Sequence, residues 1–418
     1  MSIIVTLVEL ILILSIVAIV HEFGHFLVAK AFKMTVNEFS IGFGKKLWQK
    51  EHKGTKYTFR LFLLGGYVAI EGEEGDTNDV NSFSKKPAYQ RILVLIAGVV
   101  FNFILAVIIL MGINFSSDTL TTKLKNLPQD SVLYEAGLRD GDEILKIGNV
   151  TTHIYQDIAL YNDVKNEDVL VKFLSSGEEK EVILKDAIKT KGVIGVYFKA
   201  NADAIEGEIL PLIDMVEPGG AAEKAGLKSG DLVIKVDGEA VTNTVEVINV
   251  VSQNPEKELT IEVLRNEEKE TLTLIPNKTQ YIDLGITEVE IEETTLAYSW
   301  FKSVNTVIRV VNSYADLFKG KVKLNQLSGI VGVGEMVSKT EGFIELLSLL
   351  ATISLAIGMA NIMPFPPLDG GKVVLVAIEG VTRKRVPQMV EVVLSYIGLG
   401  LLLALTVFVT IKDIIRII

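Results

Sequence analysis

The chain contains no cysteine among its 418 residues. Cysteine supplies thiol nucleophiles, thiolate ligands for zinc and disulfide bonds, so its absence excludes all three. Any soluble part of the protein must therefore be held together by its own hydrophobic core. Histidine is scarce as well, with four in the chain, so histidines at a meaningful spacing carry information.

Charge is nearly absent from four long stretches. Hydrophobic residues make up 49% of the chain and its mean hydropathy is +0.38, too apolar for an ordinary soluble protein. The stretches are residues 3–20, 92–113, 343–363 and 392–411. Each is close to the ~20 residues that a helix needs to cross ~30 Å of hydrocarbon. The sequence therefore predicts a polytopic α-helical membrane protein with about four transmembrane helices.

The first stretch lacks the marks of a cleavable signal peptide. Residues 1–10 contain no Lys or Arg, and no Ala-x-Ala cleavage site follows. The polar residues also stand at the far end of the stretch, so we expect a span that is retained.

The distribution of charge predicts an orientation. Eight basic residues lie between Lys30 and Arg60, against two acidic ones, and a second basic group lies between residues 372 and 385. By the positive-inside rule both segments face the cytoplasm and both termini face outward. Residues 116–290 hold 33 acidic and 18 basic residues, which fits an extracytoplasmic soluble region and argues against nucleic-acid binding.

That acidic region contains an internal repeat. The segment "AGLRDGDEILKIG" at residues 136–148 returns as "AGLKSGDLVIKVD" at residues 225–237, an offset of 89 residues. Both copies have the pattern of a short helix end, a Gly-Asp turn and a strand with alternating apolar residues. The repeat predicts two α+β units, which either only fill space as compact domains or bind a partner.

Residues 292–340 are less regular. The stretch "AYSWFKSVNTVIRVVNSYADLFKGKVK" has helical periodicity, with aromatic residues on one side and Lys or Arg on the other. This pattern fits an interfacial helix on the outer membrane surface. It fits an amphipathic helix packed on a domain equally well, because amphipathicity alone does not separate the two.

His21, Glu22 and His25 stand at the end of the first apolar stretch in the pattern His-Glu-x-x-His. Residues four apart lie on one face of a helix, so the two histidines can bind one zinc ion. Glu22 lies about 100° round the axis and can act on a water at the metal. Two histidines that merely cap a buried helix are disfavoured, because polar groups in a membrane are costly. His52 and His153 lie in polar surroundings and are expected at the surface.

A catalytic zinc site needs a third protein ligand. The candidate, Asp369, lies in "NIMPFPPLDGGK" at residues 361–372, where three prolines must interrupt the third span. Irregular backbone at membrane depth is tolerated only where it lines a cavity or is buried in protein. Spans one and three run in the same direction, so Asp369 and His21 come at similar depth. A plain Asp-Gly turn is the alternative interpretation.

These motifs resemble those of the site-2 protease family, most closely its bacterial regulator-of-sigma-E type of intramembrane zinc metalloprotease. The resemblance rests on HEFGH, on the Asn-x-x-Pro-x-Pro-Pro-Leu-Asp-Gly segment and on repeat units similar to bacterial PDZ domains. It extends to "FSIGFGKKLW" at residues 39–48 and "LLGGYVAIEGEE" at residues 63–74, which are similar to the family's membrane-associated β-region.

The resemblance implies roles for individual residues. Zinc would be bound by His21, His25 and Asp369, with Glu22 as the catalytic general base. Substrate handling would involve one asparagine on the third span and the glycines of the β-region, namely Asn361, Gly42, Gly44, Gly65 and Gly66.

The resemblance extends to two further segments. Gly219 and Gly220 would lie in the peptide-binding loop of the second PDZ-like unit, and Asp130 and Ser131 hold the matching place in the first. In the second span, Gly98-Val99 stands before Asn102, where the family often has Gly-Pro.

The expected organisation has eight parts. By residue number they are the first transmembrane helix with the HExxH motif (1–35), a cytoplasmic-side membrane-associated β-region and loop (36–88), the second transmembrane helix (89–114), PDZ-like domain 1 (115–202), PDZ-like domain 2 (203–290), an amphipathic membrane-surface region (291–341), the third transmembrane helix with the Leu-Asp-Gly segment (342–389) and the fourth transmembrane helix (390–418).

The implied activity is zinc-dependent cleavage of transmembrane segments within the bacterial cytoplasmic (inner) membrane. Expected substrates are single-span proteins, such as an anti-sigma factor, and remnant signal peptides. A helical substrate must unwind before cleavage, and the strand-like run at residues 56–70 is expected to pair with the extended segment. The two extracytoplasmic PDZ-like units would filter substrates by their outer portions.

Two other functions fit parts of the sequence. A catalytically inactive scaffold would use the PDZ-like units to gather membrane partners, but the intact His-Glu-x-x-His and Asp369 argue against it. A transporter or metal channel would predict an inverted repeat of membrane spans. The repeat in this sequence lies in the soluble region instead.

Overall fold

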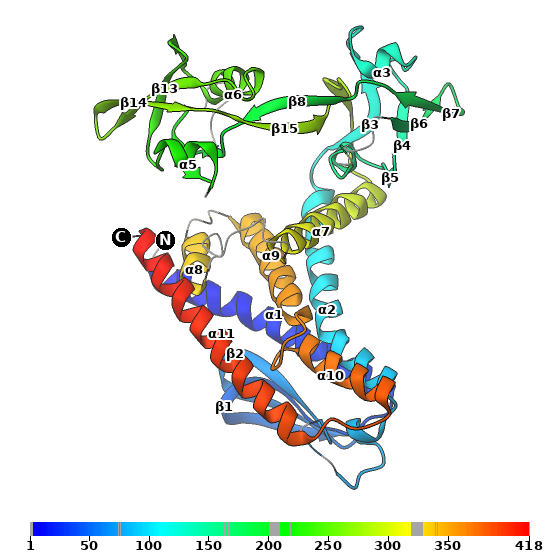
Figure 1. The fold of residues 1–418 in the computed structure, drawn as a ribbon. Coiled ribbons are helices and arrows are strands. Elements are labelled where there is room, and N and C mark those ends of the chain that lie inside the picture. Colours follow the sequence, from blue (N-terminus) through cyan, green and yellow to red (C-terminus); the bar gives the residue numbers. More distant parts are fainter. Residues whose placement is uncertain are drawn as a thin grey trace. The chain divides into compact units, whose positions relative to one another are not determined.

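The computed structural model describes residues 3–73, 75, 77–161, 164, 168–199, 210–217, 219–318, 329–338, 340 and 342–417. The chain divides into two compact units, shown in Figure 1. We call residues 1–119 with 293–418 the helical unit, and residues 120–292 the repeat unit.

Within the described residues, four helices of the helical unit are long and apolar enough to cross a membrane. They are α1 (Ile3–Ala31), α2 (Ala88–Phe115), α9 (Phe343–Ile362) and α11 (Gln388–Ile417). The four predicted spans are therefore confirmed as helices long and apolar enough to cross a membrane. Residues 21–31 contain no proline, and α1 continues through them, so the His-Glu-x-x-His pattern lies on a helix as expected.

The third span ends at the prolines, as their chemistry requires. α9 stops at Ile362, and α10 (Asp369–Thr382) begins six residues after Met363. The connecting loop folds back onto the first turn of α10: a Cβ atom on Gly370 would lie 2.2 Å from the Ile362 carbonyl oxygen, and one on Gly371 would lie 2.2 Å from the Pro366 nitrogen. These two positions accept only glycine, and Asp369 becomes the first residue of α10.

The β-region is one long antiparallel hairpin. Strands β1 (Val36–His52) and β2 (Thr55–Ile70) are joined by a two-residue turn, Lys53-Gly54, with positive φ at both positions. The register shifts several times along the hairpin, and Gly42, Gly44 and Gly65 adopt positive φ where it does. Residues 43–48 of β1 and 59–64 of β2 expose large apolar side chains, namely Phe43, Leu47, Trp48, Phe59, Leu61, Phe62, Leu63 and Leu64.

A polar cluster braces the irregular part of this hairpin. Arg60 donates hydrogen bonds to Glu38 (2.8 Å), Ser40 (2.9 Å) and the Gly44 carbonyl (2.9 Å). Burial would raise the pKa of Glu38, but hydrogen bonds from Thr58, Arg60 and Tyr67 outweigh burial and lower it. The hairpin is therefore held in one irregular shape by its own side chains.

Two further helices occupy the region expected to be amphipathic, α7 (Leu296–Phe318) and α8 (Ile330–Ser338). α7 packs on α2 through buried small polar residues. The Ser299 hydroxyl donates to the Met111 carbonyl at 2.6 Å, and Asn114 donates to Ser303 at 3.1 Å. α7 also contacts α9, and the membrane-surface location expected for this stretch stays a prediction; residues 319–328 lie outside the described part of the chain.

The sequence repeat corresponds to a structural repeat. The first copy consists of β3 (Thr119–Lys125), α3 (Val132–Glu135), β4 (Glu143–Ile147), β5 (Val150–Thr151), α4 (Tyr155–Ile158), β6 (Val169–Ser175), β7 (Glu178–Leu184), β8 (Ile188–Val193) and β9 (Val196–Phe198). The second copy has the same order, with β10 (Ile213–Val216), α5 (Ala221–Ala225), β11 (Leu232–Val236), β12 (Glu239–Ala240), α6 (Thr244–Gln253), β13 (Leu259–Arg265), β14 (Glu268–Leu274), β15 (Asn277–Ile282) and β16 (Glu288–Glu292).

The two copies exchange their last strands. β16, from the second copy, pairs with β3 of the first, and β9, from the first copy, pairs with β10 of the second. The hydrophobic cores are exchanged in the same way: Leu284, from the second copy, packs in the core of the first, and Ile194, from the first copy, packs in the core of the second. The sheet of each copy is thus completed by a strand from the other copy. Two domains that simply followed each other along the chain would not need this exchange. The expected boundary between residues 202 and 203 lies outside the described residues.

The strands before the exchange pair with each other. β8 and β15 form an antiparallel ladder of six residue pairs, from Ile188 with Ile282 to Val193 with Asn277. Because β8 and β15 are equivalent strands of the two copies, this ladder is the crossing point of the exchange.

Engineered cysteines test the exchange on a clean background, since the chain has no cysteine of its own. Tyr197 and Met215 are register partners across β9 and β10, and both side chains are exposed. We expect the double variant Tyr197→Cys, Met215→Cys to form an intramolecular disulfide on oxidation, seen as a mobility shift that reductant reverses.

The matched control places the second cysteine on β3, as Tyr197→Cys with Lys125→Cys. If the first copy closed on itself, β9 would pair with β3, and this control would cross-link instead. Cross-linking of the control in place of the Tyr197, Met215 pair would therefore contradict the exchange.

Candidate metal centre

The two histidines of α1 are buried and face each other. Nε2 of His21 lies 3.2 Å from Nε2 of His25, and the two rings meet edge to face. Their spacing of four residues places them on one face of the helix, as the sequence predicted. Two buried imidazoles with their ring nitrogens converging need a shared partner, because an unpaired polar group in an apolar environment is costly.

Asp369 supplies that partner from the other end of the chain. Its Oδ2 lies 2.9 Å from His21 Nε2 and 3.4 Å from His25 Nε2. The break at the prolines brings this carboxylate to the first turn of α10, where a negative charge also suits the helix N-terminus. We call His21, His25 and Asp369 the His–His–Asp cluster.

The cluster fits a zinc ion by its chemistry and its dimensions. The three potential ligand atoms all lie within 4.8 Å of one another. In a tetrahedral site with bonds of ~2.1 Å, neighbouring ligand atoms are ~3.4 Å apart, which is close to the separations of 2.9, 3.2 and 3.4 Å here. Two imidazoles and one carboxylate are also a ligand set typical of catalytic zinc, which keeps its fourth position open.

Glu22 lies beside the cluster and contacts the β-hairpin. One carboxylate oxygen, Oε2, accepts a hydrogen bond of 3.0 Å from the backbone N–H of Val68 on β2. Because this N–H binds a residue of α1, we infer that it points away from the partner strand β1. The expected general base is therefore positioned between the His–His–Asp cluster and the outer edge of β2.

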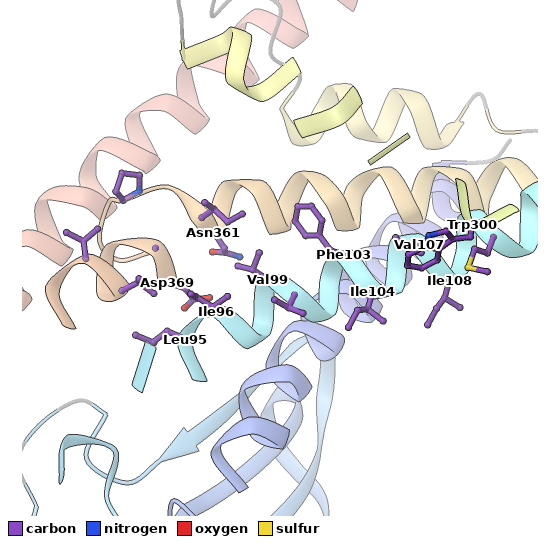
Figure 2. A pocket seen from close by; sticks show the side chains of 17 residues that line it. Leu95, Ile96, Val99, Phe103, Ile104, Val107, Ile108, Trp300, Asn361 and Asp369 are labelled. Carbon is purple, nitrogen blue, oxygen red and sulfur yellow. The ribbon is translucent and has the colours of Figure 1, made fainter. Parts of the chain in front are cut away.

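An apolar cavity of about 730 Å³ extends from the cluster along α2. Its wall follows α2 from Leu95 to Met111, ~24 Å of helix at 1.5 Å per residue. Asn361 of α9 and Asp369 line the same cavity, and Trp300 of α7 completes it. Figure 2 shows Asn361 and Asp369 toward one end and Trp300 at the other. A cluster residue therefore forms part of the wall of a long apolar space.

The four glycines expected to handle substrate all lie on the hairpin. Gly65 and Gly66 lie where β2 crosses α1: Cβ atoms there would come within 3.2 Å of Ala18 and 3.7 Å of Ile19. Gly42 and Gly44 lie on β1 and would collide with Phe62 if they carried a side chain. At these four positions the hairpin packs closely on itself and on α1.

Gly219 and Gly220 lie in the repeat unit, at the start of α5. Gly219 has a φ of +81° and donates its N–H to Glu223, and Gly220 is the N-terminal cap of α5. The loop that carries Ile194 and Gly195, just before β9, lies against Gly220. The sequence did not predict that this loop lies beside Gly220, because a single glycine in a strand-like run is the only feature that marks it.

Comparison with known proteins adds an independent observation. The family model described as Peptidase family M50 matches residues 9–405. The regulator of sigma-E protease RseP of Escherichia coli (strain K12) is 29% identical over 438 residues, covering 94% of this chain and 96% of that protein. A Fusobacterium nucleatum protein named as a zinc metalloprotease is 30% identical over 418 residues, covering 96% of each.

A solved structure matches part of the chain. The PDZ domain of HtrA3, bound to a phage-derived ligand, matches 22% of this chain and 92% of its own at 19% identity, with a TM-score of 0.19. A score this low supports no conclusion about the fold, so the PDZ-like character of the repeat unit stays a prediction.

Proposed function

The chain belongs to peptidase family M50, the site-2 protease family of metalloproteases, and from that premise we propose that it cleaves transmembrane segments of single-span proteins inside the membrane. The observation that carries the proposal is the His–His–Asp cluster. Its two histidines lie on a helix long and apolar enough to span a bilayer, and its carboxylate residue, Asp369, lines a long apolar cavity. A protease of soluble peptides has no need of such surroundings.

The chemistry assigns a role to each residue of the cluster. His21, His25 and Asp369 would hold zinc, which supplies a Lewis acid that polarises a peptide carbonyl and makes water more acidic. Glu22 does not belong to the cluster and would accept a proton from the attacking water. It would then deliver that proton to the leaving amine, which is general acid–base catalysis by one carboxyl group.

The apolar cavity is where the substrate's transmembrane segment would lie. A wall of ~24 Å along α2 covers most of the ~30 Å of hydrocarbon that such a segment crosses. Asn361 offers an amide at the end near Asp369, where a peptide bond released from its helix would expose unpaired polar groups. An amide can satisfy either a carbonyl or an N–H of the unwound segment.

The outer edge of β2 would receive the unwound segment as an added strand. Val68 presents its backbone N–H on that edge, next to Glu22. Pairing with a strand edge compensates the substrate for the helical hydrogen bonds it has lost. Helix-weakening residues such as Gly or Pro near the cleavage site should therefore favour cleavage.

The repeat unit would act as a filter for substrates. Its acidic, PDZ-like domains belong to the extracytoplasmic side on the positive-inside argument, away from a cluster that lies toward the cytoplasmic side of the bilayer. The names of relatives as regulators of sigma-E point to an anti-sigma factor type of substrate. Cleavage would then follow removal of the substrate's bulky outer domain, and remnant signal peptides would meet the same requirement.

The proposed base is tested by Glu22→Gln, which keeps the shape of the side chain and removes its basicity. We expect cleavage of a labelled single-span substrate by detergent-purified protein to fall roughly 10²- to 10⁴-fold. Zinc content, counted on the same samples, should not change, because Glu22 is not part of the cluster.

Glu9→Gln is the matched control, since Glu9 is another acidic residue of α1. It should leave both cleavage and zinc content as in the wild type. Undiminished cleavage by Glu22→Gln would contradict the assignment of the base.

The proposed substrate cavity is tested by filling it. Ile104 lines the cavity, whereas Leu93, equally exposed on α2, is not one of its lining residues. We expect Ile104→Trp to lower kcat/KM for the single-span substrate roughly tenfold, because about 1–2 kcal/mol of apolar contact is lost. Leu93→Trp should cost far less, and zinc content should be unchanged in both. Equal effects of the two substitutions would refute the cavity as the substrate site.

A further inference from the structure

One face of α2 meets the two histidines directly. Val94, Gly98 and Asn102 are spaced four residues apart and therefore lie in one row on that helix. Each of them contacts His21, His25 or both. None of the three was assigned a role from the sequence, and the inference about them rests on the proposed zinc site.

Val94 fixes the orientation of His25. The Nδ1 atom of His25 lies 2.8 Å from the Val94 carbonyl oxygen, a buried contact. A carbonyl can only accept a hydrogen bond, so Nδ1 carries the proton. Nε2 of the same ring then has a free lone pair that points at the cluster, which is the tautomer a metal ligand requires.

Asn102 holds the equivalent position for His21. Its side chain is fully buried, with Nδ2 3.3 Å from His21 Nδ1, while Oδ1 has no hydrogen-bond partner among the described residues. The two ends of a carboxamide have nearly the same shape, so turning it by 180° exchanges them. The turned amide gives the orphaned oxygen a donor, the Nδ1–H of His21, and leaves Nε2 free for the metal.

The backbone carbonyl of Asn102 is also bound. It accepts a hydrogen bond of 2.8 Å from the buried hydroxyl of Ser354 on α9. This contact fixes the position of α2 along its axis relative to α9. The side-chain amide of Asn102 is therefore held at the level of His21.

Gly98 leaves the space that the imidazoles occupy. A Cβ atom at this position would lie 2.5 Å from Nε2 of His25 and 2.7 Å from Nε2 of His21. Both distances fall inside van der Waals contact and involve the atoms that face the metal. Even a methyl group would therefore push the two ligand nitrogens out of place.

We propose that this face of α2 is the support of the zinc site: Asn102 is a positioning residue for His21, as the Val94 carbonyl is for His25, and Gly98 keeps the ligand nitrogens in register. The neighbouring face of α2 lines the substrate cavity. One helix therefore orients the metal ligands on one side and receives the substrate on the other.

Zinc affinity, measured by chelator competition on the purified full-length protein, tests the role of Asn102. Asn102→Leu keeps the volume and removes the acceptor, and we expect it to weaken zinc binding about 10- to 100-fold. Asn102→Asp keeps an acceptor oxygen at the same place and should restore near-wild-type affinity. The visible spectrum of the cobalt-substituted protein should change in the leucine variant and not in the aspartate variant.

Gly98→Ala gives a second, independent test. We expect it to weaken zinc binding at least as strongly, whereas Gly112→Ala should have no effect, because a Cβ on Gly112 meets no described atom within 4 Å. This pair also decides the matter if Asn102→Leu does not fold.

Two results would overturn the inference. One is zinc affinity in Asn102→Leu and Gly98→Ala equal to that of the wild type; the other is a loss in Asn102→Asp as large as in Asn102→Leu, since packing alone would then explain it. A wild-type protein that binds no zinc would instead refute the proposed zinc site itself, so the two failures are distinguishable.

Discussion

The close approach of α1 and α2 is the constraint on which the helical unit depends. Each helix places a glycine at the contact: a Cβ on Gly24 would lie 2.5 Å from the Ala97 carbonyl oxygen, and one on Gly98 would collide with both histidines. Helices that come this close bring backbone acceptors within reach of buried imidazoles, which would otherwise be costly in an apolar environment. The two histidines of the cluster are oriented by this contact, and the cavity runs along the neighbouring face of α2.

Part of the site could be predicted because helix geometry is regular. A spacing of four residues places His21 and His25 on one face whatever the rest of the fold does. Asp369 could be paired with them from the depth of two parallel spans, although the two segments are 348 residues apart. The contact between Val94 and His25 could not be predicted, because a backbone carbonyl is the same in every residue. The hydrogen bond from Val68 to Glu22 likewise depends on how the hairpin docks on α1.

The repeat unit shows a different limit of sequence reasoning. The 89-residue offset predicted two similar units, and the two copies do have the same order of elements. The exchange of β9 and β16 could not be predicted, because a terminal strand has the same sequence whether it pairs within its own copy or with the other. The glycines of the hairpin show the same limit, since positive φ and close packing account for them without reference to substrate.

The central claim is that one zinc ion is held by two imidazoles and one carboxylate inside the helical unit. Zinc X-ray absorption spectroscopy of the detergent-purified protein tests it most directly. The account predicts one zinc per chain, with two imidazole nitrogens and one carboxylate oxygen at ~2.0–2.2 Å and a four-coordinate geometry. A protein without zinc, or a six-coordinate ion surrounded by water with no imidazole signal, would contradict it.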